Sequence, residues 1–321
     1  MKYLAVCVVC GGGWLAAQAQ AQSQAPPYPA RPVRVIVPFA AGGGSDLSAR
    51  QIAAKLSEHL GQQFVIDNRG GGGGLIGMEI TAGSAPDGHT IMFSSGSYAA
   101  AMAMRKSSYD MLKSIVPIVE VAASPYVVAV HPSLPANMKA LLDFARDKPG
   151  QLAYASTGVG GLTHLASELL LHMAKVRITH VPYKGAGAAL PDVLAGRSPI
   201  LMTTPISLMP HFQSGRLRAL AVTGTARSSE LPDVPTVVET VPGYVVYTWY
   251  AMFAPGGTPR AVVDRLNAMV NKILNDREMK KSFETQGIEA VGGPPEKLGM
   301  VVREDYVRWA GVVKDNNITA D

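Results

Sequence analysis

The stretch VIVPFAAGGGSDLSAR (Val35–Arg50) sets a buried strand, a glycine turn and a helix directly after one another. Glycines let a backbone approach its neighbours closely and adopt conformations that other residues resist. Ser45 and Asp46 follow the glycines and are residue types that favour the start of a helix. Because the first amides of a helix have no partner within it, the turn is either a tight packing element or an open site for an anion.

Strand-like and helix-like segments alternate along the rest of the chain. The strands are continuous apolar runs, and the helices repeat apolar residues every three or four positions, as from Ala49 to Leu60, where Gly61 supplies a stop. This alternation predicts an α/β fold with two mainly parallel sheets flanked by helices. The order of strand, glycine-rich turn and helix recurs in Leu152–Leu170 and, more loosely, in His180–Arg197.

Two proline-marked strands, Ser124–Pro132 and Pro242–Pro255, are expected to connect two lobes. The expected first lobe comprises residues 25–123 and 248–321, and the second comprises residues 124–247. Two connecting strands with a ligand cleft between the lobes would form a hinge that closes on a ligand.

Residues 1–21 have the pattern of a secretory signal peptide, with cleavage expected after Ala19 or Ala21. A lipid anchor at Cys10 is the weaker alternative, because Val9 precedes it where a small residue is usual. Both cysteines, Cys7 and Cys10, lie in this segment, so the mature chain has neither a disulfide framework nor a thiolate metal site. We therefore expect an exported periplasmic protein.

The charge of the chain argues against nucleic acid as a partner. The formal net charge is +5, or +4 once Lys2 is removed with the signal peptide, and no basic run with interleaved aromatic residues occurs. Such a modest excess would mildly favour anionic small molecules. Two helix starts facing each other across a cleft, each worth about 0.3–2 kcal/mol to an anion, would suit a small carboxylate.

The sequence resembles the receptors of tripartite tricarboxylate transporters, also called Bug proteins. The resemblance follows the order of the whole mature chain, in the segments YPARPVRVIVPFAAGGGSDLSAR, NRGGGGGLIGMEI, SAPDGHTIMFSS, YASTGVGGLTHLASELL, HVPYKGAGAALPDVLAGR, LRALAVTGTARSSELPDVPTVVE and FAPGGTP. It implies a periplasmic binding protein of two α/β lobes that delivers its ligand to integral membrane transporter subunits. It also implies that the turns Phe39–Asp46 and Ser156–His164 hold a ligand carboxylate, partly through ordered waters.

The residues expected to bind the ligand come from these two turns and from two strand ends. They are Phe39, Ala41, Gly42, Gly43, Gly44, Ser45, Asp46, Ser95, Ser156, Thr157, Gly158, Gly160, Gly161, Thr163, His164 and Thr203. No catalytic residue, metal or cofactor is expected, and the protein is expected to be a monomer.

Two positions depart from the pattern of the family. Gly70 stands where a proline is common, and Thr203 and Thr204 stand where an Asp-Asn pair is common. Without an acid there, a ligand ammonium group would lack a counter-charge. The sequence thus favours a di- or tricarboxylate, or an aromatic carboxylate, over an amino acid.

Other interpretations are weaker. Gly72–Gly77 fits the dinucleotide fingerprint, but no convincing acidic strand end follows, and a structural turn is preferred. A serine hydrolase would need a nucleophile elbow that is missing, although Ser45 after three glycines imitates one. A sensory protein that presents its ligand to a receptor kinase would have the same fold. His164 is equally open to ligand contact and to packing, Tyr98 and Tyr126 to cleft lining and to core packing, and Trp249 is expected to pack at the hinge.

Overall fold

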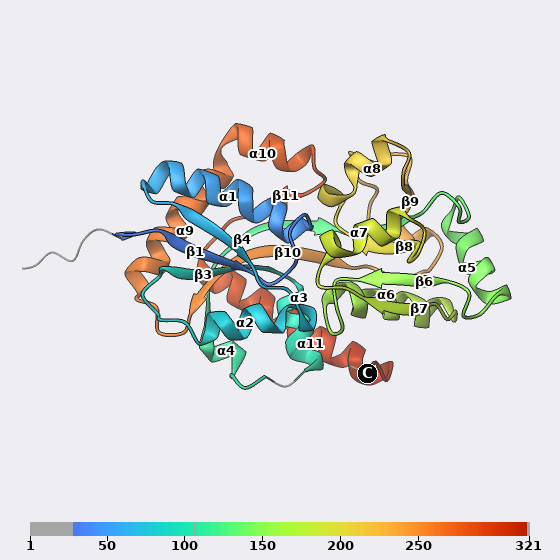
Figure 1. Cartoon of the computed structure of the whole chain (residues 1–321), viewed down its shortest axis with the longest axis horizontal. Coiled ribbons are helices and arrows are strands. Elements are labelled where there is room, and N and C mark those ends of the chain that lie inside the picture. The colour runs from blue at the N-terminus through green and yellow to red at the C-terminus, as the bar shows by residue number, and fades with distance from the viewer. Residues whose placement is uncertain (1–27, 106, 320–321) are drawn as a thin grey trace, which may run out of the picture.

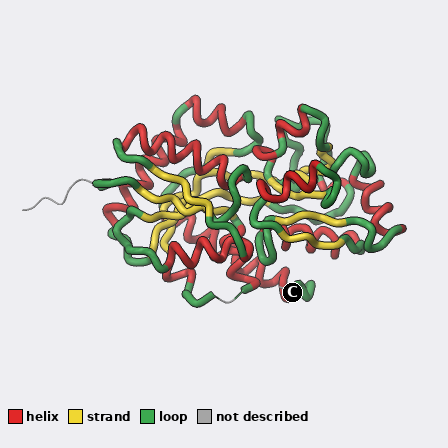
Figure 2. The backbone as a smooth tube through the Cα atoms, in the orientation of Figure 1, coloured by secondary structure: helices red, strands yellow, loops and turns green. Residues whose placement is uncertain are grey.

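The computed structural model describes residues 28–105 and 107–319. Two β-sheets lie side by side along the long axis of the molecule, with helices on their outer faces (Figures 1 and 2). The predicted signal peptide lies outside the described residues. Within the described part of the chain, no helix combines the length and apolar character needed to cross a membrane.

The first sheet has six strands in the order β11-β4-β10-β3-β1-β2. Its strands come from the N-terminal third and from the C-terminal part of the chain: β1 (Val33–Val37), β2 (Phe64–Asn68), β3 (Thr90–Ser95), β4 (Ile115–Pro125), β10 (Tyr247–Pro255) and β11 (Glu289–Ala290). The second sheet has five strands in the order β7-β6-β8-β5-β9. They come from the middle of the chain: β5 (Val127–Val130), β6 (Ala153–Ser156), β7 (Thr179–Pro182), β8 (Ile200–Thr203) and β9 (Arg218–Val222).

The two sheets are mixed, which corrects the prediction of mainly parallel pairing, while the predicted α/β class is confirmed. In the first sheet β1 pairs in parallel with β2 and β3, but β10 is antiparallel to both β3 and β4. The reason is topological: β4 leaves the first sheet towards the second, and β10 returns from it. In the second sheet β5 is likewise antiparallel to β8 and β9, while β6 is parallel to β7 and β8.

Helices cover both faces of each sheet. They are α1 (Gly44–Leu60), α2 (Leu75–Ala82), α3 (Ser97–Met104), α4 (Met111–Ser114), α5 (Met138–Asp147), α6 (Leu162–Ala174), α7 (Ala186–Leu194), α8 (Met209–Gln213), α9 (Arg260–Asn275), α10 (Arg277–Glu284) and α11 (Pro295–Asp315). On the first sheet, α1, α9 and α10 share one core and α2, α3 and α11 share another. On the second, α5 and α6 pack on one face and α7 on the other.

Helix α1 shows how the sequence dictates the local structure. Ile52 and Leu56 are almost fully buried in the core of the first sheet, and each contributes about 1.5–3 kcal/mol by leaving water. Gly61 ends the helix in a left-handed conformation with φ of 71°, and its amide donates to the Ser57 carbonyl. The buried stripe therefore fixes α1 on the sheet with its first residues at the end of β1.

The chain passes between the sheets at three places. β4 ends at Pro125 and β5 begins at Val127, so Tyr126 lies between them. β10 brings the chain back, and the long helix α11 extends from the first sheet to the second. Its Leu298 packs in a core of the first sheet, whereas Trp309 is completely buried in a core of the second.

Candidate functional site

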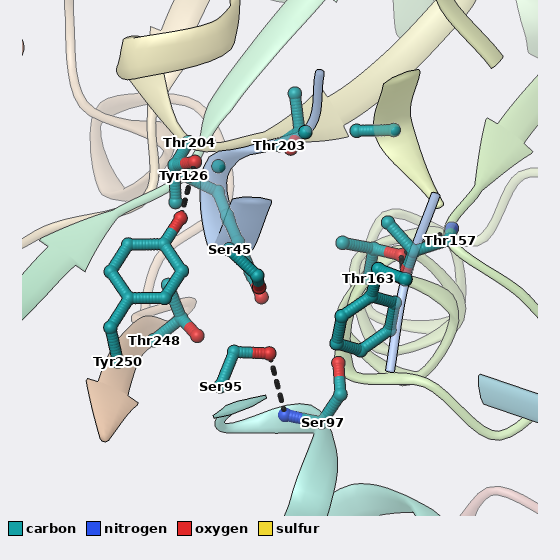
Figure 3. A pocket seen from close by; sticks show the side chains of 14 residues that line it. Ser45, Ser95, Ser97, Tyr126, Thr157, Thr163, Thr203, Thr204, Thr248 and Tyr250 are labelled. Carbon is teal, nitrogen blue, oxygen red and sulfur yellow. Dashed lines mark hydrogen bonds between the residues drawn. The ribbon is translucent and has the colours of Figure 1, made fainter. Parts of the chain in front are cut away.

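A pocket lies between the two sheets, where the carboxyl ends of β1, β3, β6 and β8 approach one another (Figure 3). This is the usual place for a ligand in open α/β sheets. The empty space between its lining residues, part of which is open to solvent, is about 350 Å³. The lining residues are Phe39, Gly43, Gly44, Ser45, Ser95, Ser97, Tyr126, Thr157, Thr163, Ala186, Thr203, Thr204, Thr248 and Tyr250.

Hydroxyl groups dominate this lining, and no charged side chain is part of it. Ten of the fourteen lining residues are serine, threonine or tyrosine. Each hydroxyl can both donate and accept a hydrogen bond. The site is therefore built for a polar ligand that is held by dipoles and not by an opposite side-chain charge.

The start of α1 presents unused backbone donors to this pocket. The amides of Gly43, Gly44, Ser45 and Asp46 have no hydrogen-bond partner among the described residues, and no side chain caps the helix at Gly43. Gly43, Gly44 and Ser45 line the pocket. Together with the partial positive charge at the helix start, these donors make the first turn suitable for an anion.

Asp46 shapes this turn and does not line the pocket. Its carboxylate accepts three hydrogen bonds: from the Gly42 amide at 2.9 Å, from the Asn68 side-chain amide at 3.0 Å and from Arg50 Nε at 3.0 Å. Burial by itself raises the pKa of Asp46, but these hydrogen bonds outweigh it and lower the pKa. The Asp46 side chain is thus ionised and fixes the Gly42 amide by a hydrogen bond. Asn68 stabilises the same turn by donating a second hydrogen bond to the Phe39 carbonyl.

The second turn differs from the first, because most of its amides are already used. The amide of Thr157 donates to Thr163 Oγ1 at 2.9 Å, and that of Leu162 donates to Ser97 Oγ at 3.0 Å. The amides of Gly158 and Gly160 also have side-chain partners, and that of Gly161 donates to the Gly158 carbonyl. The expected pair of equivalent helix starts is therefore asymmetric: the second turn offers the hydroxyls of Thr157 and Thr163 where the first offers amides.

Two histidines, His164 buried and His180 partly buried, support the second turn. His164 and His180 stack with their ring centroids 4.1 Å apart. His164 Nδ1 accepts the Gly160 amide at 3.3 Å, and His180 Nε2 lies 2.6 Å from Ser156 Oγ. Burial lowers the pKa of both imidazoles to about 4, so both are neutral at pH 7. His164 packs beneath the turn and does not line the pocket.

One side of the pocket is closed by backbone contact between the first turn and the segment 184–187, which includes the start of α7. The Ala40 amide donates to the Lys184 carbonyl at 2.8 Å. Gly187 approaches so closely that an added Cβ would lie 1.8 Å from the Ala41 carbonyl oxygen. Only a residue without a side chain permits this contact.

A second backbone contact joins the glycine run after β2 to the second turn. Gly73 has φ of 65°, and a Cβ on it would lie 2.5 Å from the Gly161 nitrogen. Gly158, with φ of 126°, lies against Gly73 in turn. The motif Gly72–Gly77 thus forms a structural turn at the pocket, with a short 3₁₀ segment at Gly72–Gly74 before α2.

Half of the sequence-predicted site residues line the pocket. Those that do are Phe39, Gly43, Gly44, Ser45, Ser95, Thr157, Thr163 and Thr203. The others lie in the two turns without lining it, and they brace or connect the turns: Ala41, Gly42, Asp46, Ser156, Gly158, Gly160, Gly161 and His164.

Several lining residues were not in the predicted set: Ser97, Tyr126, Ala186, Thr204, Thr248 and Tyr250. The sequence leaves Tyr126 open to cleft lining and to core packing, and the structure places it in the pocket lining. The third glycine turn indicates Ala186, and the second hinge strand contains Thr248 and Tyr250 without singling them out. Tyr98, in contrast, is a core residue that stacks on Phe253 and donates to the Met111 carbonyl. Trp249 is buried beside the hinge and donates to Asp305 at 2.7 Å.

Residues 48–318 match the family described as the tripartite tricarboxylate transporter family receptor. The chain belongs to this family. It is 36% identical to Protein BugT of Bordetella pertussis over 293 residues, which cover 90% of each chain. The resemblance inferred from the sequence motifs is therefore confirmed.

Two solved structures of similar proteins contain a carboxylate. Rpa4515 of R. palustris, solved with adipate, is 36% identical with a TM-score of 0.88, over 91% of this chain and 99% of that one. MatC (Rpa3494) from Rhodopseudomonas palustris, solved with malate, is 31% identical with a TM-score of 0.85, over 89% and 100%. The binding-protein fold and the assignment as a solute-binding receptor of a periplasmic family, and not as an enzyme, are confirmed.

Proposed function

We propose that this receptor captures a small organic carboxylate, either a di- or tricarboxylate or an aromatic carboxylate, in the hydroxyl-lined pocket. The observation that carries the proposal is the set of amides at Gly43–Asp46 that have no partner within residues 28–105 and 107–319, and three of these four residues line the pocket. One ligand carboxylate would accept hydrogen bonds from these amides, either directly or through water. Each hydrogen bond to a charged group contributes about 1.5–3 kcal/mol. Thr157 and Thr163 would complete its surroundings from the second turn.

A plain carboxylate suits the pocket better than an amino acid does. The lining contains no aspartate or glutamate, so a buried ligand ammonium group would have no counter-charge. Aliphatic or aromatic carbon atoms could pack on Phe39, while the hydroxyls of Ser45, Ser95 and Thr203 select the remaining polar groups.

We also propose the biological setting that the family suggests. Residues 1–21 direct export to the periplasm, where the mature chain acts as a monomer and delivers its ligand to integral membrane transporter subunits. Residues 25–123 with 248–321, and residues 124–247, would move as two lobes about β4 and β10. The sensory alternative has no observation in its favour, and the hydrolase alternative lacks a general base, since no histidine lines the pocket beside Ser45.

Isothermal titration calorimetry with matched carboxylates and carboxamides tests the proposal. Succinate, adipate, citrate and benzoate are compared with succinamide, adipamide and benzamide, and with glutamate and aspartate. We expect at least one carboxylate to bind at least about tenfold more tightly than its neutral amide, because the amide cannot form charge-assisted bonds. Equal binding of acid and amide, or glutamate or aspartate ahead of every plain carboxylate, would contradict it. Native mass spectrometry of the purified protein identifies any carboxylate that remains bound.

A further inference from the structure

The start of α6 is capped by a residue of the other sheet. Gly161, at the N-cap position of α6, has no side chain that could cap the helix. The amide of Leu162, the first residue of α6, instead donates to Ser97 Oγ at 3.0 Å. Ser97 is the first residue of α3, which follows β3 of the first sheet. In Figure 3 the Ser97 hydroxyl lies on the side of the pocket where Thr157 and Thr163 are found.

We propose that Ser97 is a positioning residue for ligand binding, which fixes the second turn at the pocket by capping α6 from the first sheet. The inference rests on the proposed function, because it takes the hydroxyls of the second turn to contact a carboxylate. It goes beyond that function by assigning control over the place of the second turn to a residue outside both glycine turns.

The position of Ser97 is set by the first sheet. The next residue, Tyr98, is buried in a core of that sheet, where its ring stacks on Phe253 with centroids 4.9 Å apart. The amide of Gly96, directly before Ser97, donates to the Trp249 carbonyl of β10 at 3.0 Å. The hydroxyl that caps α6 therefore belongs to a segment that is fixed on both sides.

The contact between α3 and α6 keeps water away from this hydrogen bond. Ser97 is 2% exposed, and Leu162 is completely buried. A Cβ on Gly96 would lie 2.7 Å from Leu162 Cδ2, and Ala100, one turn after Ser97, shares a core of the second sheet with Leu162. Because a buried amide without an acceptor is unfavourable, loss of the Ser97 oxygen should shift the start of α6 until the amide reaches another partner.

The hydroxyls that the second turn presents to the pocket are built on the same helix start. Thr163 directly follows Leu162, and its Oγ1 accepts the Thr157 amide at 2.9 Å. The Thr157 and Thr163 hydroxyls are also 2.8 Å apart, and both residues line the pocket. A displacement of the start of α6 therefore moves both hydroxyls relative to a ligand.

The cap also explains why the two turns differ. Gly44, the first residue of α1, has an amide with no partner within residues 28–105 and 107–319, whereas the equivalent amide of Leu162 is bonded to Ser97. The start of α1 thus remains open to an anion, while the start of α6 is closed and presents side-chain hydroxyls.

Calorimetry and hydrogen exchange test the inference with Ser97→Ala, which removes the oxygen that caps α6. The probe is the acid among succinate, adipate, citrate and benzoate that the wild type binds most tightly. We expect the dissociation constant of Ser97→Ala to rise about tenfold, the scale of one lost hydrogen bond. In the ligand-free variant, hydrogen-exchange mass spectrometry should show faster exchange in the segment 157–165 than in the wild type.

A double-mutant cycle with Thr163→Val separates positioning from direct ligand contact. Thr163→Val removes the hydroxyl of the second turn and keeps the shape of the side chain, so Ser97→Ala should weaken binding by about threefold or less in that background. Ser94→Ala is the matched control, because Ser94 is a buried serine of β3 that does not line the pocket. It should leave the dissociation constant unchanged, and urea denaturation records the stability of every variant.

The outcomes separate the inference from the proposed function. If Ser97→Ala lowers the free energy of unfolding but binds the acid as the wild type does, the cap is only structural and the inference is wrong. Equal losses of affinity on Ser97→Ala in the wild-type and Thr163→Val backgrounds would mean that Ser97 contacts the ligand directly, and would also overturn it. If the wild type binds none of the acids, the proposed function is wrong for these acids. Unchanged exchange in the segment 157–165 would independently show that Ser97 does not position the second turn.

Discussion

Replacing Gly187 by alanine is expected to prevent full closure of the pocket. The added Cβ would lie 1.8 Å from the Ala41 carbonyl oxygen and 2.8 Å from its carbonyl carbon. Ordinary contacts of a Cβ begin at 3.4 Å, so the two segments must separate by about 1.6 Å. Both neighbours are backbone atoms, and no side-chain rotation relieves the clash.

The size of the effect follows from what the substitution leaves intact. Gly187 is in the first turn of α7, where alanine is favoured over glycine by roughly 1 kcal/mol in helix propensity, so α7 itself is not weakened. The cost falls on the contact between the sheets: about 1–3 kcal/mol for overpacking, and about 1 kcal/mol for the Ala40–Lys184 hydrogen bond if it breaks. Since each 1.4 kcal/mol is tenfold in affinity, a total cost of about 1–4 kcal/mol should weaken binding by about 5- to 700-fold.

Calorimetry and small-angle X-ray scattering at saturating ligand provide the measurement. Gly187→Ala should have a larger dissociation constant than the wild type, and at saturating ligand a larger radius of gyration. Gly311→Ala, in α11, is the control, because its added Cβ meets no atom within 4 Å. The reasoning is refuted if Gly187→Ala binds as tightly and becomes as compact as the wild type.

Three further results are expected. Gly43→Ala should bind almost normally because its Cβ meets nothing closer than 3.5 Å, whereas Gly43→Val should abolish binding in calorimetry while circular dichroism stays unchanged. Asp46→Asn should lower the free energy of unfolding by about 1–3 kcal/mol, measured by urea denaturation, because the Gly42 amide and Arg50 lose a charged acceptor. The third concerns pH: His164 and His180 have native pKa values of about 4 against 6.5 when unfolded, so the unfolded state binds more protons between these values. Stability should therefore fall as pH decreases from about 6.5 to 4, and a His164→Gln/His180→Gln variant should show a flatter melting temperature from pH 6.5 to 5.

Local patterns of the sequence were sufficient to predict most of the fold. The apolar runs VRVIV (33–37), TIMFS (90–94), YVVAV (126–130) and PILMT (199–203) predict β1, β3, β5 and β8 to within one residue at each end, and Gly61 marks the end of α1. The antiparallel pairing of β10 was not predictable in this way. The pairing depends on where the returning strand enters the first sheet. The apolar pattern of β10 is the same for a parallel and an antiparallel strand, so it does not indicate the direction.

The site shows the same division between local and distant information. The first turn could be predicted because its glycines and its helix start are adjacent in the sequence. The asymmetry between the two turns could not, because it depends on Ser97, whose hydroxyl accepts an amide 65 residues away. Likewise, Thr204 and Tyr250 meet across 46 residues, and no local pattern in the sequence predicts that contact.

The glycines around the pocket have two separate physical roles. Gly43 and Gly44 leave backbone amides open to a ligand, whereas Gly73, Gly158 and Gly187 allow backbone segments from opposite sheets to touch. The second group does not line the pocket, so a substitution there should change the affinity for every ligand by a similar factor. A substitution of a lining hydroxyl such as that of Ser45 or Thr203 should instead change the order of preference among ligands. Closure and selection are therefore carried by different residues, and mutations can alter one while leaving the other in place.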